Sequence, residues 1–367
     1  MIQYYKSKFS AIFAIFSDTL HLSRKKFIFA FILSLIEQKS VQFPILAPKL
    51  NSERSESSNL RRIQSFFSDY ALDYTLFARV LYYLLGSQKL LLSIDRTNWK
   101  FGTQNINILA LTAYYKGIGF PLFFKLLDKR GNSNYQERID LLGEFVSIFG
   151  SKRIARVVGD REFIGHQWLA WLQEKQIPFV MRLPKHHHIK LENGEVYEAE
   201  KLVGNKNYVF YENATVDQIK TNIVIKRLQG ELLILIGKGK AKNVFKIYRK
   251  RWSIEVFFQA CKKRGFNLED THLKDLERLK KLMVLVAITF TFCLKIGIWK
   301  HQKIQEIPYK NHGYKAKSFF RYGLDVWANI TAFIHQRQEK IEKLLDLLLQ
   351  EIRQRMQQEK IKKNIFM

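Results

Sequence analysis

The chain has 367 residues, enough for a large buried core and for two or three folded units. Its 61 Lys and Arg residues against 33 Asp and Glu residues leave a net charge of +28, which indicates a polyanionic partner. DNA is the commonest such partner, and an anionic membrane is the alternative. Two cysteines, Cys261 and Cys293, exclude a disulfide framework and a thiolate zinc site, and they favour a reducing cytoplasm.

Residues 1–88 alternate apolar runs at helical spacing with basic or polar breaks, which predicts a small helical domain with basic edges. Arg61 and Arg62 precede Ile63, Phe66 and Phe67, so cations border an apolar helix face. These helices either contact DNA or cap the domain that follows. DNA contact is favoured, although the region shows no clear helix-turn-helix pattern.

A continuous apolar run at residues 89–94, KLLLSI, predicts a central strand that is buried on both faces and ends at Asp95. Open α/β sheets place functional groups at this end of their strands. Strand-like runs at 107–115 and 120–127 predict a hairpin with its turn at 116–119. A helix over 134–149 follows, with Ser133 as the expected cap.

A second buried strand is predicted over residues 153–159, and it ends at Asp160. Glu162 either adds a fourth carboxylate to the site or pairs with Arg161. Pairing, or a role in supporting the site residues from behind, is favoured. A helix over 166–175 and a strand over 178–183 come next. Three adjacent histidines at 186–188 cannot all face one metal from regular structure, so we expect a polar loop there and no zinc site.

Strand-like runs at 208–211, 223–228 and 232–236 separate Asp160 from the stretch YRKRWSIEVFFQACK at 248–262. On a single helix, at about 100° per residue, four residues of this stretch share one stripe beside an apolar face: Tyr248, Arg251, Glu255 and Lys262. A solvated charged face is the ordinary explanation of a basic helix. A half-buried helix that holds one carboxylate among cations is the favoured interpretation here.

The chain beyond His272 is predicted to be helical. Residues 282–299 are long enough to raise the question of a membrane span, but polar residues interrupt them, so a buried core helix is favoured. The final helix, from about Ala332, presents an apolar face of four residues: Ile341, Leu345, Leu348 and Ile352. This face either contacts a second copy or packs within the monomer.

The spacing of Tyr248, Arg251, Glu255 and Lys262 resembles the signature of the insertion-sequence-four family of DDE transposases. The segments DRTNW at 95–99 and DREFIG at 160–165 resemble the family's sequences around its first two catalytic aspartates. GFNLEDTHL at 265–273 also suits the family. The resemblance is specific over about 90–273 and only general outside that range.

This resemblance implies an α/β fold with a ribonuclease H-like catalytic core, in which helices flank a mixed sheet. The core is expected over residues 89–300, with a β-rich insertion at about 184–240. Helical regions at 1–88 and 301–367 are expected to contact the DNA ends and a second copy, respectively.

The resemblance also implies metal-dependent cleavage of DNA at the ends of an insertion sequence, followed by transfer of the 3′-hydroxyl into target DNA. Asp95, Asp160 and Glu255 are then the catalytic residues and the ligands of two magnesium ions, for which manganese can substitute. The DNA-binding residues are Tyr248, Arg251, Lys262, Arg161, Arg61 and Arg62. The expected partners are double-stranded DNA and a second copy in a homodimer, with no membrane, in the cytoplasm of a bacterium or archaeon.

Two alternatives stay open at this point. A ribonuclease H-like metal-dependent nuclease would cut nucleic acid without joining strands. An inactive basic DNA-binding relic would bind and not cut.

Overall fold

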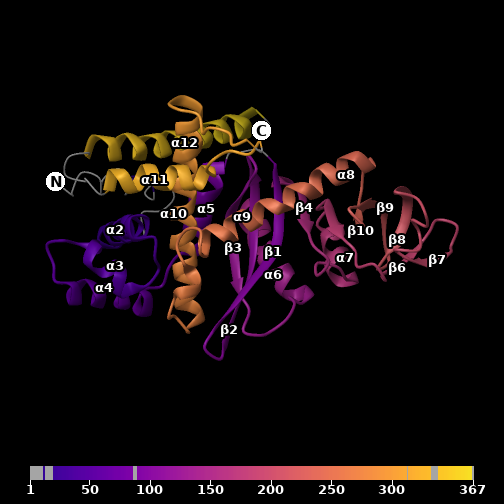
Figure 1. The fold of residues 1–367 in the computed structure, drawn as a ribbon, viewed down its shortest axis with the longest axis horizontal. Coiled ribbons are helices and arrows are strands. Elements are labelled where there is room, and N and C mark those ends of the chain that lie inside the picture. The colour runs from indigo at the N-terminus through magenta and orange to yellow at the C-terminus, as the bar shows by residue number, and fades with distance from the viewer. Residues whose placement is uncertain (1–10, 13–19, 86–88, 312, 332–337, 366–367) are drawn as a thin grey trace. The chain divides into compact units, whose positions relative to one another are not determined.

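The computed structural model describes residues 11–12, 20–85, 89–311, 313–331 and 338–365. These residues form two compact units (Figure 1). The sheet unit comprises residues 88–99 and 105–256. The helical unit comprises residues up to 87, residues 100–104 and residues from 257 onward.

A ten-stranded sheet organises the sheet unit, in the order β3-β2-β1-β4-β5-β10-β9-β8-β6-β7. The strands are β1 (Leu90–Phe101), β2 (Gln104–Tyr115), β3 (Ile118–Leu126), β4 (Ile154–Gly159), β5 (Phe179–Arg182), β6 (His188–Lys190), β7 (Val196–Glu198), β8 (Tyr208–Val216), β9 (Ile219–Leu228) and β10 (Glu231–Gly237). At the centre, β4 runs parallel to both β1 and β5. Val157 and Val158 are both fully buried, so β4 is covered on both faces, as the apolar run predicts.

The strands between β5 and α8 continue this sheet instead of forming a second one. β10 pairs antiparallel with β5, β9 with β10, and β8 with β9. The short strands β6 and β7 complete the edge. The chain therefore leaves the centre of the sheet after β5 and returns to it through β10.

Three helices pack in the sheet unit: α6 (Tyr135–Phe149), α7 (His166–Glu174) and α8 (Ala241–Tyr248). The expected cap of α6, Ser133, is wrong. Asn134 caps the helix in a reciprocal pair with Glu137, because Ser133 is engaged by Glu162 instead. α8 packs Val244 and Tyr248 against valine and leucine side chains of β4, β5, β9 and β10.

The single helix expected over 248–262 is in fact two helices. α8 ends at Tyr248, a 3₁₀ segment η2 (Arg249–Trp252) follows, and α9 (Ser253–Cys261) then begins. A 3₁₀ segment has three residues per turn, so residues three apart eclipse each other. Arg251 accordingly lies over the ring of Tyr248, with 5.8 Å from its guanidinium carbon to the ring centroid.

The helical unit contains α2 (Leu22–Gln38), α3 (Phe43–Leu50), α4 (Glu56–Asp69), α5 (Tyr74–Leu85), α10 (Leu276–Lys303), α11 (Phe319–Thr331) and α12 (Gln338–Ile365). α10 is long and apolar enough to cross a membrane, yet 94% of its most apolar window is buried inside the protein. This burial supports the interpretation of α10 as a core helix. Near its ends, Lys281 donates to the carbonyl of Phe67 at 2.8 Å and Lys295 pairs with Glu351.

The apolar face predicted for the last helix is buried within the chain. Ile341, Leu345, Leu348 and Ile352 are each fully buried, and α12 packs against α5 and α10. Packing within the monomer therefore accounts for this face. The fold class is confirmed: helices flank a mixed sheet, with helical regions at both ends of the chain, consistent with a ribonuclease H-like core.

Gly119 in β3 allows the sheet to approach the start of α9. A β-carbon there would lie 2.9 Å from the carbonyl oxygen of Ser253 and 3.0 Å from the α-carbon of Ile254. We predict that Gly119→Ala displaces α9 and lowers the free energy of unfolding by about 1–3 kcal/mol. The matched control is Gly143→Ala in α6, where a β-carbon meets no atom within 4 Å. Equal melting temperatures for the two variants would contradict the prediction.

Candidate active site

The two predicted aspartates lie side by side at one edge of the parallel strands. Ser93 of β1 pairs with Val158 of β4, and the same register carried two residues further brings Asp95 level with Asp160. β1 does not end at Ile94 as expected but continues to Phe101, beyond the end of its pairing with β4. Asp95 therefore lies where β1 is no longer paired with β4, at the edge of the sheet that open α/β folds use for functional groups.

Arg251 joins the three predicted acids. Its guanidinium lies 2.5 Å from a carboxylate oxygen of Asp95, 3.1 Å from one of Glu255 and 3.8 Å from one of Asp160. The Arg251 side chain is only 10% exposed, whereas those of Asp95, Glu255 and Asp160 are 19%, 28% and 34% exposed. The structure thus gathers the three acids around one buried cation, with the carboxylates toward solvent.

Tyr248 and Arg182 complete the surroundings of Asp160. The Tyr248 hydroxyl donates to Asp160 at 3.3 Å, and burial raises the pKa of this phenol to about 12, so it stays a donor. Arg182 approaches the same carboxylate at 3.8 Å. Sequence reasoning missed Arg182, although it follows Met181, which pairs with Gly159 in the parallel strand β4. Asp160 follows Gly159 and Arg182 follows Met181, so the two residues lie at the same edge of the sheet.

Burial also changes the acidity of Asp95. Loss of solvent around this carboxyl raises its pKa to about 6, although the Arg251 guanidinium and the Arg96 amide act in the opposite direction. The negative charges of Asp160 and Glu255 add to the rise. A carboxyl with this pKa takes up or releases its proton close to neutral pH.

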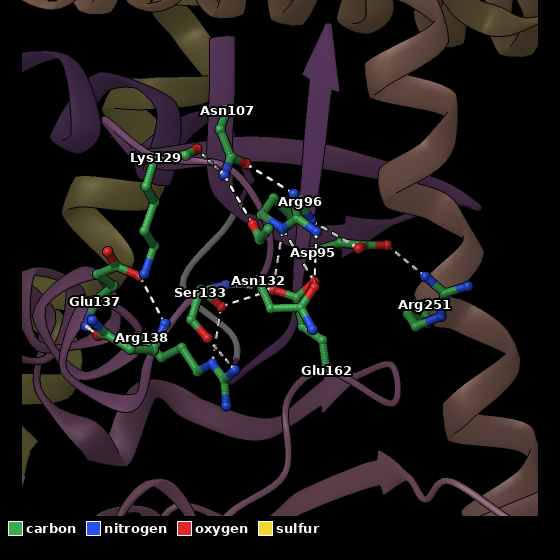
Figure 2. Close-up of polar contacts among 12 residues, drawn as sticks. Asp95, Arg96, Asn107, Lys129, Asn132, Ser133, Glu137, Arg138, Glu162 and Arg251 are labelled. Atoms are coloured by element: carbon green, nitrogen blue, oxygen red, sulfur yellow. Dashed lines mark hydrogen bonds and ion pairs between the residues drawn. The ribbon is translucent and has the colours of Figure 1, made fainter. Parts of the chain in front are cut away.

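A partly buried polar network lies next to Asp95 (Figure 2). The Arg96 backbone amide donates to Asp95 at 2.8 Å, and its guanidinium contacts both carboxylate oxygens of Glu162, at 3.1 and 3.3 Å. Asn107 and Asn132 also accept from this guanidinium, each at 3.1 Å. Glu162 therefore pairs with Arg96 and not with Arg161, and this places it in the supporting position beside the site that was the other favoured expectation.

Glu162 links the two segments of the chain that carry the predicted aspartates. It lies two residues after Asp160, which follows the end of β4, and its partner Arg96 directly follows Asp95. It also accepts from the amide and hydroxyl of Ser133, whose hydroxyl accepts from Arg138. The Arg96–Glu162 pair consequently fixes the spacing of the two aspartates. The dipeptides Asp95-Arg96 and Asp160-Arg161 look alike in sequence, so no local signal distinguishes which arginine pairs with Glu162.

The other predicted site residues lie as follows. Arg161 is exposed, and its backbone amide donates to Asp160 at 2.8 Å. Lys262 follows the end of α9 in the helical unit and pairs with Glu269 at 2.9 Å. Arg61 is exposed on α4, and Arg62 beside it is half-buried, where burial and Arg54 lower the pKa of its guanidinium.

The donor chemistry of the three acids suits a hard divalent cation, since Mg²⁺ prefers carboxylate oxygens. Among the residues that the structure describes, however, the group of three whose ligand atoms all lie within 4.8 Å of one another is His186, Glu198 and Glu200, not the three acids. Arg251 lies between the acids, with its guanidinium within 3.8 Å of a carboxylate oxygen of each. His186 is 76% exposed and lies 3.1 Å from Glu200, while its neighbour His187 pairs with Asp217.

Comparison with protein families matches residues 86–292 to the transposase DDE domain. The matched range contains Asp95, Asp160, Glu255 and Arg251. Domains of this type use divalent metals and act on DNA. A comparison with curated protein sequences finds no match.

The raised pKa of Asp95 predicts a pH dependence of stability. In the unfolded chain this carboxyl ionises near pH 3.9, but in the folded protein near pH 6. The folded state holds this proton more tightly than the unfolded chain does. Protonated Asp95 therefore stabilises the folded state at low pH, and this stabilisation is lost as the pH rises through 6. We expect the stability of the native protein relative to Asp95→Asn to fall by roughly 2–3 kcal/mol between pH 4 and pH 7. Denaturant unfolding of both proteins in chelator measures this, and a constant difference would contradict it.

Glu162→Gln should destabilise the sheet unit, because the change leaves the Arg96 guanidinium without its countercharge in a site where both side chains are 15% exposed. The expected loss is about 2–3 kcal/mol of unfolding free energy. Glu212→Gln, at an exposed carboxylate of β8, is the matched control and should leave the melting temperature unchanged. A Glu162→Gln variant as stable as this control would show that the pair does not hold the segments together.

Proposed function

Because the chain belongs to the family of proteins with a transposase DDE domain, we propose that it is a DNA transposase of an insertion sequence. It cleaves DNA at the ends of the element and transfers the freed 3′-hydroxyl into target DNA. The fit of Tyr248, Arg251, Glu255 and Lys262 to the insertion-sequence-four signature supports assignment to that branch of the family.

The observation that carries the proposal is the convergence of Asp95, Asp160 and Glu255 on one guanidinium. The acids come from β1, from the residue after β4 and from α9, which are widely separated in the chain. Packing alone gives no reason to assemble three carboxylates at one partly exposed site, because their mutual repulsion opposes folding. A function that needs their combined negative charge gives such a reason.

Asp95, Asp160 and Glu255 would hold two magnesium ions, for which manganese can substitute. Two bound ions would activate the attacking oxygen and stabilise the leaving oxygen of a phosphodiester. The protein's own part is to present the carboxylates from a rigid sheet edge. Arg251 has to leave the acids for this, and its guanidinium would then be available to a phosphate of the DNA end.

The remaining DNA contacts are proposed from the same family likeness. Tyr248 and Lys262 would position the transposon end, and exposed Arg161 would contact the backbone near Asp160. Arg61 and Arg62 of α4 would contribute to end binding by residues 1–88. Two ends have to be joined at once, so a homodimer is the expected working state, on DNA in a bacterial or archaeal cytoplasm.

The experiment that tests this function is cleavage and joining of labelled DNA carrying the element's own inverted-repeat ends, with magnesium or manganese. We expect joined products from the native protein. Glu255→Gln should reduce both cleavage and joining by at least about 10³-fold, because one oxygen ligand loses its charge. Glu174→Gln, at a 67% exposed carboxylate, is the control and should behave as the native protein does.

Each other outcome identifies one of the alternatives. Cutting without joining, lost in Glu255→Gln, would indicate a nuclease. Tight DNA binding by both proteins without metal-dependent cutting would indicate a DNA-binding relic.

A further inference from the structure

A compact group of metal-ligating side chains lies at the edge of the sheet formed by β6 and β7, which is the edge opposite to β3 (Figure 1). His186 belongs to the segment between β5 and β6, Glu198 ends β7, and Glu200 follows two residues later. One ligand atom of each lies within 4.8 Å of those of the other two. The Nδ1 atom of His186 is 3.1 Å from a carboxylate oxygen of Glu200 and 4.0 Å from one of Glu198.

The two carboxylates of this group are held in place by the backbone around them. Their side chains are 30% and 32% exposed, whereas that of His186 is 76% exposed. The amide of Ala199 donates to the carbonyl of His187 at 2.9 Å, and that of Glu200 donates to the carbonyl of Lys185 at 3.0 Å. Two like charges are thus fixed beside one imidazole, and their mutual repulsion opposes this arrangement unless a cation neutralises it.

The chain itself supplies little positive charge to this group. The ammonium of Lys201 lies 3.3 Å from a carboxylate oxygen of Glu198, on a side chain that is 66% exposed. Glu200 forms its ion pair, within the described residues, with His186. One solvent-exposed ammonium therefore faces two carboxylates, and a further cation between them would be stabilised.

A second imidazole lies on the same face of the hairpin. His188 is the partner of Glu198 across β6 and β7. The hydrogen bond between Ala199 and His187 makes the adjacent His188–Glu198 pair a non-hydrogen-bonded one, in which side chains approach closely. His188 is exposed, whereas Ile189, the next residue of β6, is fully buried. Two of the three adjacent histidines consequently lie on the side of the two glutamates.

Imidazole nitrogen together with two carboxylates is a donor set for zinc. Zinc takes three or four protein ligands from histidine, cysteine and carboxylate groups, and water fills an open position. Magnesium prefers oxygen ligands, and imidazole shifts the preference toward the later first-row transition metals. The expectation of no zinc site considered the adjacent histidines alone. The pairing of β6 with β7 adds two glutamates from the facing strand as ligands.

We propose that His186, Glu198 and Glu200 bind a zinc ion, with His188 or water in the fourth position. The ion replaces the Lys201 ammonium at Glu198. It ties the segment that leaves β5 to the end of β7 and so stabilises the outer edge of the sheet. This site is separate from the three acids and takes a different class of metal, so the proposal does not depend on the proposed function.

The test is calorimetric titration of zinc into the full-length protein, prepared without a histidine tag and kept in excess magnesium. We expect about one zinc equivalent whose affinity falls by at least about tenfold in His186→Ala and in Glu200→Gln, since each variant loses a ligand. Lys201→Met should strengthen zinc binding, because it removes the competing ammonium. Zinc should also raise the melting temperature of the native protein and leave that of His186→Ala unchanged.

The controls are His21→Asn, at an exposed histidine that caps α2, and Glu212→Gln, at an exposed carboxylate of β8. Asparagine also favours the capping position, so both controls should keep native stability and native zinc affinity. Melting temperatures measured without zinc show whether each variant is folded.

Native zinc affinity in folded His186→Ala or Glu200→Gln overturns the proposal and leaves a surface ion pair. Displacement of the zinc by an equal concentration of magnesium also overturns it, because that result indicates a non-specific acidic surface. Zinc binding is measured without DNA, so its failure is distinct from failure of the cleavage assay.

Discussion

The ion pairs between Arg251 and the three acids determine much of what this structure can do. Three carboxylates at one site repel each other, and partial burial of Asp95 adds to the cost of keeping them ionised. A buried guanidinium from the same turn that leads into Glu255 supplies the opposing charge. The site is thereby stable without being closed, since the carboxylates are more exposed to solvent than the Arg251 guanidinium that pairs with them.

The sheet provides the precision of this arrangement. Parallel pairing of β4 with both β1 and β5 brings Asp95, Asp160 and Arg182 to the same edge, and the Arg96–Glu162 pair ties the first two segments together beyond the last backbone pairing. The third acid depends on different contacts. α8 packs on the sheet through Val244 and Tyr248, and Gly119 lets β3 approach the first residues of α9. Each acid is thus positioned by its own set of neighbours.

Much of the fold could be predicted from the sequence because its signals are local. The apolar runs before Asp95 and Asp160 specify buried strands, and both strands are present. What could not be predicted depends on contacts between distant residues. Nothing in the stretch around Tyr248 indicates that a 3₁₀ segment interrupts the helix, and nothing around Ser133 indicates that Glu162 engages it.

The sequence predicts which residues form the site better than it predicts how these residues pair with one another. The three acids and Tyr248 do come together with Arg251. The countercharge role of Arg251 could not be foreseen, because a cation three or four residues from two site residues is equally compatible with a free, DNA-facing side chain. Arg182 and Arg96 were missed because their roles follow from strand register and from a pair that spans distant segments.

The return of the chain through β10 has a consequence for how this protein can change. β10 hydrogen-bonds to β5 at the centre of the sheet and leads directly to α8. The position of Glu255 therefore depends on β10 and α8, and not on the conformation of the chain from β6 to β9. The turn at Gly194, between β6 and β7, lies in the outermost part of this excursion, with its glycine at positive φ. Segments inserted or removed there would alter the far edge of the sheet while the distance between the second and third acids stays the same. The length of the excursion is thus free to vary between related chains without moving the acids that frame it.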